Sequence, residues 1–186
     1  MKLNLKKFIR IVKTVLVAVL AFAIISQWHS GNFSRLYVAI VTLPAIFLFD
    51  ILRIKKAEQL EIAYLAFLTL GAILGSVFGW YADFDGLDKV VHFVSGIVCV
   101  YFGLFIIKRL GIKSKSPLGI ILFLIGLTAL IAVSWEACEY FSNFITHGDP
   151  QNVQYSGVDD TMWDMMFAVL GASLTTLYLW RTKKLQ

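Results

Sequence analysis

Charged side chains are scarce in this chain. Only 16% of its 186 residues are charged, whereas 59% are hydrophobic. A water-soluble domain rarely reaches that balance, because polar side chains must cover most of its surface. The composition therefore argues against an ordinary soluble domain and predicts a membrane protein.

Cysteines and familiar catalytic motifs are also sparse. The two cysteines, Cys99 and Cys138, form no Cys-x-x-Cys metal spacing, and they lie at different depths of their apolar runs, which argues against a disulfide. The sequence contains no supporting motif for Ser-His-Asp catalysis, no phosphate-binding loop and no dinucleotide fingerprint. It also lacks a low-complexity linker, so we expect one transmembrane domain over residues 1–186.

Long hydrophobic runs dominate what is present. Six of them lie near residues 8–28, 36–52, 61–81, 90–107, 117–140 and 161–180. At ~1.5 Å per residue, each is long enough, or nearly so, to cross ~30 Å of hydrocarbon, although Pro44 and Asp50 weaken the second. The first has no clean small-x-small cleavage pattern, so we expect an uncleaved span. These runs predict an all-α, polytopic membrane protein with a six-transmembrane-helix bundle.

Lysine and arginine are distributed unevenly between the connections. If all six runs cross, 15 of the 17 cations lie on one side, and Arg35 and Lys89 lie on the other. Because cations mark the cytoplasmic side, we expect both termini in the cytoplasm (N-in/C-in) and a multi-pass protein of the bacterial cytoplasmic (inner) membrane. Topology then explains the net charge of +5. The expected partner is the lipid bilayer, and no nucleic acid is expected.

Glycines in the apolar runs predict close packing between helices. Gly71, Gly75 and Gly79 form a stripe at four-residue spacing that would let helices approach closely. The same role is expected for Gly96, Gly103, Gly126 and Gly171.

Two local pairs involve residues near the predicted inner surface. Ser116 followed by Pro117 predicts an N-cap and a first-turn proline for the fifth span. Asp50 and Arg53 lie one turn apart, and an ion pair between them is the simplest expectation.

Acidic residues favour the side opposite to the cations. Nine of the twelve fall at or beyond the outer boundary of the predicted spans: Asp83, Asp85, Asp88, Glu136, Glu139, Asp149, Asp159, Asp160 and Asp164. Acidic residues do little to set topology, so this bias is independent information about the outer face.

Three segments at that face carry paired polar residues. The spacing puts each pair on one helix face: Asp88 with His92, Glu136 with Glu139, and Asp160 with Asp164. All three helix ends are expected at the same membrane depth. The sequence therefore predicts a shared polar cluster.

Ordinary helix chemistry offers a competing interpretation for part of this cluster. Asp88 could be an N-cap, Thr161-x-x-Asp164 has the form of a capping box, and His92 could be a hydrogen-bonded bundle histidine. Glu136 and Glu139 are harder to explain, because they are expected at the C-terminal end of the fifth span, where the helix dipole disfavours anions. Several carboxyls could be protonated, the helix could continue into solvent, or a cation could be bound.

Of these alternatives we favour a bound cation. Carboxylates with one imidazole suit one divalent metal ion such as Mg, Mn, Fe or Zn, and no other cofactor is expected. The candidate ligands are His92, Glu136, Glu139, Asp160 and Asp164. Glu136 or Glu139 is the candidate general base. Asp88, Lys89 and Thr161 complete the polar cluster.

The segments "DKVVHFVSG", "WEACE" and "DDTMWDMMFAVLGA" carry a family resemblance. They resemble the signature segments of the YjdF-type uncharacterised bacterial inner-membrane proteins and, more distantly, the VanZ-like family linked to glycopeptide antibiotic resistance. The resemblance covers Asp88 to Ala172 and implies that the polar residues named above form a shared cluster. The nearer family implies no agreed activity.

Three functions are compatible with this sequence. The first is binding, hydrolysis or transfer at the outer membrane face on a lipid or lipid-linked cell-envelope substrate, with the long polar segment near 141–160 as a lid. The second is a non-catalytic scaffold whose charged cluster locks helix ends together. The third, transport of protons or metal ions, is weaker, because no charged residue falls in the middle of a span.

Overall fold

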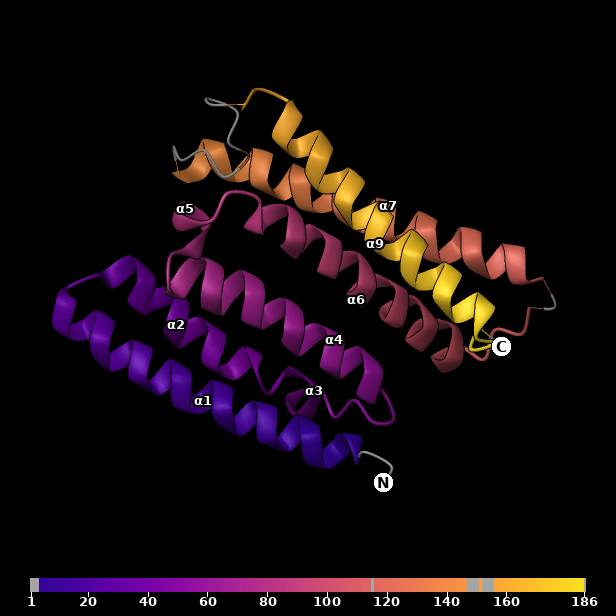
Figure 1. Ribbon diagram of the computed structural model, residues 1–186, viewed down its shortest axis with the longest axis horizontal. Coiled ribbons are helices and arrows are strands. Elements are labelled where there is room, and N and C mark those ends of the chain that lie inside the picture. Colours follow the sequence, from indigo (N-terminus) through magenta and orange to yellow (C-terminus); the bar gives the residue numbers. More distant parts are fainter. Residues whose placement is uncertain (1–3, 115, 147–150, 152–155, 186) are drawn as a thin grey trace. The chain divides into compact units, whose positions relative to one another are not determined.

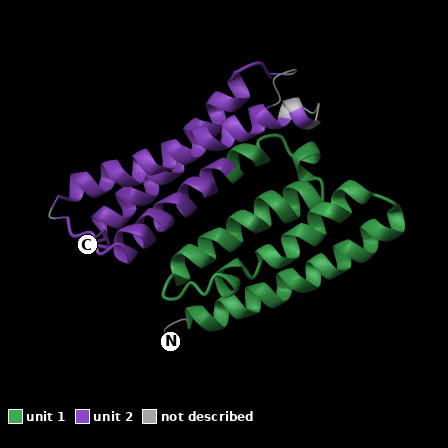
Figure 2. Ribbon diagram, turned by 180° about the vertical axis from the view of Figure 1, so that it is seen from behind, with its two compact units in different colours: residues 1–91 green, residues 92–186 purple. Residues whose placement is uncertain are grey.

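The computed structural model describes residues 4–114, 116–146, 151 and 156–185. Every regular element in that part of the chain is a helix, which confirms the all-α class for these residues. The chain divides into two compact units, residues 1–91 and 92–186, shown in Figure 2. The expectation of one transmembrane domain stays a prediction.

The helices follow the apolar runs closely. The first unit contains α1 (Leu5–Ser30), α2 (Phe33–Ala45), α3 (Leu48–Ile51), α4 (Glu58–Leu68), the π-helix η1 (Thr69–Val77) and α5 (Trp80–Asp83). Helix α6 (Leu87–Arg109) begins there and continues into the second unit, which also holds α7 (Pro117–Thr146) and α9 (Asp159–Arg181).

Five helical stretches are long and apolar enough to cross a membrane: Leu5–Ser30, Glu58–Val77, Leu87–Arg109, Pro117–Ser142 and Asp159–Arg181. The second apolar run is different, because α2 has only 13 residues. Pro44 lies inside α2 near its end, where it removes a backbone donor and crowds the preceding turn. The run is therefore split between α2 and α3, and the count of six spans stays a prediction.

Polar side chains cap the starts of α1, α2 and α7. Asn4 accepts a hydrogen bond from the Lys7 amide at 3.2 Å, and Asn32 accepts one from the Arg35 amide at 3.2 Å. The predicted start of α7 is confirmed, because the Gly119 amide donates to Ser116 Oγ at 3.2 Å.

The core of the first unit lies between α1, α2 and the continuous α4–η1 helix. Leu20, Ile46, Ile73 and Val77 are at most 1% exposed there. Figure 1 shows α1 and α2 side by side, and α2 contacts η1. Burial of these aliphatic side chains holds the antiparallel hairpin against the longer helix.

The glycine stripe in η1 does pack closely, but a tyrosine fills most of it. A Cβ at Gly75 would overlap the Tyr81 ring, which α5 supplies. Gly79 has a left-handed φ of 80°, and a Cβ there would overlap the Arg35 guanidinium. The stripe therefore accommodates side chains, and the expectation that it lets helices approach closely is wrong.

The expected pair between Asp50 and Arg53 is wrong. Lys13 of α1 donates to Asp50 Oδ2 at 2.5 Å and also pairs with Glu61 of α4 at 2.5 Å. Lys13 is buried, so carboxylates from two other segments offset the desolvation of its ammonium group.

Helices α6 and α9 approach closely within the second unit, in addition to the contact of α7 with α9. A Cβ at Gly96 would overlap the carbonyl oxygen of Ala168, and one at Gly171 would overlap the carbonyl oxygen of Phe93. The predicted role of these glycines in close packing is therefore confirmed. For Gly126 it is wrong, because nothing lies within 4 Å of an added Cβ.

This difference gives a direct test of the α6–α9 contact. Gly171→Ala should destabilise the protein by about 1–3 kcal/mol, because its methyl group would meet backbone atoms that cannot move independently. Gly126→Ala, also in a helix, should leave stability unchanged or slightly higher. Thermal unfolding of both variants in detergent checks this; equal stability of the two would contradict the contact.

Candidate functional site

The first turns of α6 position two of the predicted site residues. Asp88 lies in the first turn and His92 lies one turn later on the same face. The boundary between the two units falls inside α6, so both residues stand on one continuous helix. Because α6 begins at Leu87, Asp88 is not an N-cap, although the helix dipole still favours an anion there.

Asp164 is placed differently from what a capping role requires. Helix α9 begins at Asp159, and the N-cap position, Val158, has no side-chain cap. Asp164 therefore lies in the second turn, where it is only 3% exposed. The capping-box interpretation of Thr161 and Asp164 is wrong for this helix start.

His92 and Asp164 face each other across α6 and α9. His92 Nε2 lies 3.8 Å from Asp164 Oδ1, and both side chains are largely buried. The glycine contact explains the approach, because Gly96 and Ala168 lie one turn further along the same two faces. Because the two backbones approach closely there, the side chains one turn earlier are near enough for a polar contact.

Asp88 completes a group of three with this pair. One ligand atom each from Asp88, His92 and Asp164 lies within 4.8 Å of the others. Lys89 Nζ also lies 3.2 Å from Asp88 Oδ2. The structure therefore brings together an acidic/His cluster with one neighbouring cation.

The two glutamates of α7 have different environments. Glu136 is buried, at 5% exposure, whereas half-buried Glu139 accepts a hydrogen bond from the exposed Trp135 indole at 2.8 Å. The helix runs on to Thr146, about two turns beyond Glu139, so the expected position of the glutamates at its C-terminal end is wrong. Exposure to solvent does not account for Glu136.

A residue that sequence reasoning missed connects α7 with α9. Gln151 is buried, and its Nε2 donates to the Glu136 carbonyl at 3.2 Å and to Thr161 Oγ1 at 3.3 Å. Thr161 lies one turn before Asp164 on α9. One amide therefore ties the α7 backbone at Glu136 to the start of α9. A single glutamine in a polar segment gave no signal of this role.

The remaining predicted residues are placed as follows. Asp160 is half-buried in the first turn of α9 and is not part of the group of three. Residues 147–150 and 152–155 of the predicted lid lie outside the described residues. Cys99 and Cys138 are free, as predicted.

The donor set is chemically suitable for a divalent metal ion. Ligand atoms lie about 2.0–2.2 Å from zinc, so two ligands of one ion are at most about 4.4 Å apart. The separation of 3.8 Å between His92 Nε2 and Asp164 Oδ1 fits this limit, whereas the bound of 4.8 Å for the whole group of three lies slightly above it. Asp88 would supply a second carboxylate, and oxygen-rich sets with one imidazole accept hard or borderline metals.

Comparison with known proteins places this fold in a family. The model of a family described as "Predicted membrane protein (DUF2238)" matches residues 8–185. The chain belongs to the DUF2238 family. The matched region includes every residue of the acidic/His cluster.

A relative of this DUF2238 protein is an uncharacterized protein from Thermotoga maritima. The two are 25% identical over 126 residues, which are 68% of this chain and 64% of the relative. The chain thus matches less than two thirds of that relative's length. No solved structure matches the chain.

The His92–Asp164 contact can be measured by a double-mutant cycle. His92→Ala, Asp164→Ala and the double variant should show a coupling free energy of roughly 0.5–3 kcal/mol, because each single change removes the partner of a buried group. Unfolding in detergent supplies the four stabilities. The exposed Asp159 serves as control, since its replacement by alanine should be additive with His92→Ala. Additivity in both cycles would show that the pair does not interact.

Proposed function

We propose that this protein crosses the bacterial cytoplasmic membrane six times, with both termini in the cytoplasm. Helix α2 alone spans about 20 Å, less than the ~30 Å of a hydrocarbon core. The chain continues through the turn and α3, however, and this broken segment could complete the second crossing. The side that carries 15 of the 17 cations supports the orientation.

Single-cysteine labelling tests this topology. In a background without Cys99 and Cys138, Lys55→Cys and Lys183→Cys should both react only from the cytoplasmic side, and Asp85→Cys only from the outside. If α2 and α3 together do not cross, every later connection changes side. Lys55→Cys labelled from outside would therefore contradict the six-span topology.

We further propose that the acidic/His cluster binds one divalent metal ion and the phosphate-bearing head of a lipid or lipid-linked cell-envelope substrate. The observation that supports this most directly is the close group of Asp88, His92 and Asp164. Two carboxylates and one imidazole leave ligand positions for water or substrate oxygen. Lys89, beside Asp88, adds a cation suited to a phosphate.

The neighbouring side chains suggest separate roles. When bound, the metal would supply Lewis-acid polarisation of a phosphoryl oxygen and activation of water. Buried Glu136 is the better candidate for a general base, because Glu139 is held by the Trp135 indole. Gln151 would position Glu136 relative to α9 through its two hydrogen bonds. Glu139 and Asp160 remain candidate ligands from the sequence, although neither belongs to the group of three.

A non-catalytic scaffold is the second candidate. The contact of His92 with Asp164 is an ion-pair geometry that could lock α6 to α9 without a ligand. The two functions differ in metal binding, which only the first requires. Membership in the YjdF-type group would agree with either candidate function. A VanZ-like activity stays a hypothesis that rests on the sequence resemblance alone.

Metal analysis separates the two candidates. The purified full chain, equilibrated with Mn²⁺ or Zn²⁺ and then desalted, should retain about one ion, measured by elemental analysis. Asp164→Asn and His92→Ala should each lower the affinity at least about 10-fold, because each removes one of few ligands. Asp85→Asn, an exposed acid outside the group, is the matched control. Metal retained equally by Asp164→Asn and by the wild type would remove the proposed site.

A further inference from the structure

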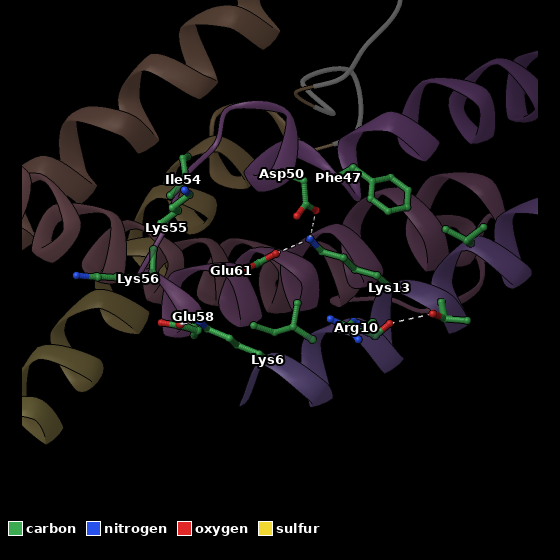
Figure 3. Close-up of a pocket in the computed structure, with 14 residues that line it drawn as sticks. Lys6, Arg10, Lys13, Phe47, Asp50, Ile54, Lys55, Lys56, Glu58 and Glu61 are labelled. Atoms are coloured by element: carbon green, nitrogen blue, oxygen red, sulfur yellow. Dashed lines mark hydrogen bonds and ion pairs between the residues drawn. The ribbon is translucent and has the colours of Figure 1, made fainter. Parts of the chain in front are cut away.

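A cavity of about 750 Å³ opens among α1, the α3–α4 connection and the start of α4. All of its lining residues belong to the first unit, and it shares no residue with the acidic/His cluster. Figure 3 shows the charged side chains that surround it. Five of the lining residues are basic and three are acidic, so the cavity has a net positive lining.

A fixed ionic group forms one wall of the cavity. Lys13 lies between Asp50 and Glu61, as Figure 3 shows, and its side chain is only 10% exposed. Its ammonium group also lies 5.9 Å from the centre of the Phe47 ring. Two carboxylates already neutralise the Lys13 ammonium group, so Lys13 links the segments that form the cavity wall. The net positive charge of the lining must therefore come from other residues.

That excess lies at the rim. Lys6 pairs with Glu58 at 4.0 Å, so Glu58, the third acidic residue of the lining, neutralises Lys6. Within the described residues, no carboxylate lies within 4.0 Å of the charged groups of Arg10, Lys55 or Lys56. Arg10 belongs to α1 and Lys55 to the α3–α4 connection, and both side chains are exposed. These cations give the rim a positive charge that favours an anion.

The start of α4 adds hydrogen-bond donors beside the rim. Ala57 occupies its N-cap position and provides no capping side chain, and both Ala57 and Glu58 line the cavity. The first amide groups of a helix lack intrahelical partners and favour anions. Lys56 also adopts a left-handed φ of 60°, a strained conformation that is found more often at ligand sites.

Apolar side chains also line the cavity, among them Ile9 and Val17 of α1 and Ile54 of the α3–α4 connection. Val17 lies further along α1 than the basic residues, whereas Ile9 and Ile54 are sequence neighbours of Arg10 and Lys55. Because α1 is a candidate membrane span, the cavity combines a basic rim near a helix end with an apolar wall along the span. We infer that it binds the phosphate headgroup of an anionic membrane lipid, whose glycerol and upper acyl carbons would contact the apolar wall.

A second cavity, of about 860 Å³, lies within the second unit and is also partly basic. Its cations, Lys113, Arg181 and Lys183, are all exposed, and the described residues that line it include no acidic residue and no buried charged side chain. It therefore lacks the fixed polar wall that distinguishes the cavity beside Lys13.

Native mass spectrometry of the full chain in detergent tests the lipid site. The protein would be titrated with dioleoylphosphatidylglycerol, with dioleoylphosphatidylcholine and with phosphatidylglycerol in the presence of inorganic phosphate. The wild type should bind the first phosphatidylglycerol more tightly than phosphatidylcholine. Arg10→Gln combined with Lys55→Gln should weaken that step roughly 25-fold, at about fivefold for each cation removed.

A matched variant separates the site from general surface charge. Lys7→Gln combined with Arg53→Gln also removes one lysine and one arginine from the same two segments, but neither residue lines the cavity. The affinity of this variant for phosphatidylglycerol should lie within about twofold of the wild-type affinity. Circular dichroism should show that both variants are folded.

Three results would overturn the inference. The first is equal binding of phosphatidylcholine and phosphatidylglycerol. The second is equal weakening by the cavity variant and the matched variant. The third is displacement of the lipid by millimolar inorganic phosphate, which would identify free phosphate as the ligand.

Discussion

The close approach of the α6 and α9 backbones is the contact on which the candidate site depends. Gly96 and Gly171 have no side chains, and the carbonyl oxygens of Ala168 and Phe93 occupy the space where a Cβ would be. Helices in a bilayer gain little from hydrophobic association, so close packing of small residues is a main source of their attraction. One turn away, the same geometry brings His92 to within 3.8 Å of Asp164.

Buried ionic groups in both units follow the same physical rule. A charged side chain within a membrane protein is costly unless another group offsets its desolvation. Lys13 is neutralised by Asp50 and Glu61, and Asp164 faces His92. Each contact joins elements that are distant in sequence, so the ionic groups fix helix arrangement whatever else they bind.

Much of the helical framework could be predicted from the sequence, because apolar length, proline and capping residues act locally. The break near Pro44 and the start of α7 at Ser116 are examples. The convergence of Asp88, His92 and Asp164 was also foreseeable, since helical spacing and a common predicted depth restrict where these side chains can lie.

The predictions from sequence were wrong where a contact depended on a partner distant in the sequence or on where a helix ends. Asp50 has a cation one turn away, yet it pairs with Lys13, 37 residues earlier, because that ammonium is buried. Helix α7 continues beyond its apolar run, since loss of hydropathy does not itself end a helix. Gln151 links α7 to α9 through two hydrogen bonds that no local sequence pattern predicts.

Cross-linking between α6 and α9 tests the central claim most directly. In a protein without Cys99 and Cys138, cysteines would replace His92 and Asp164, and membranes would be treated with a short bifunctional thiol reagent. Peptide mass spectrometry should find the link between positions 92 and 164 in high yield, and little link between 92 and the exposed position 159. Equal yields for the two pairs, or no link between 92 and 164, would contradict the account.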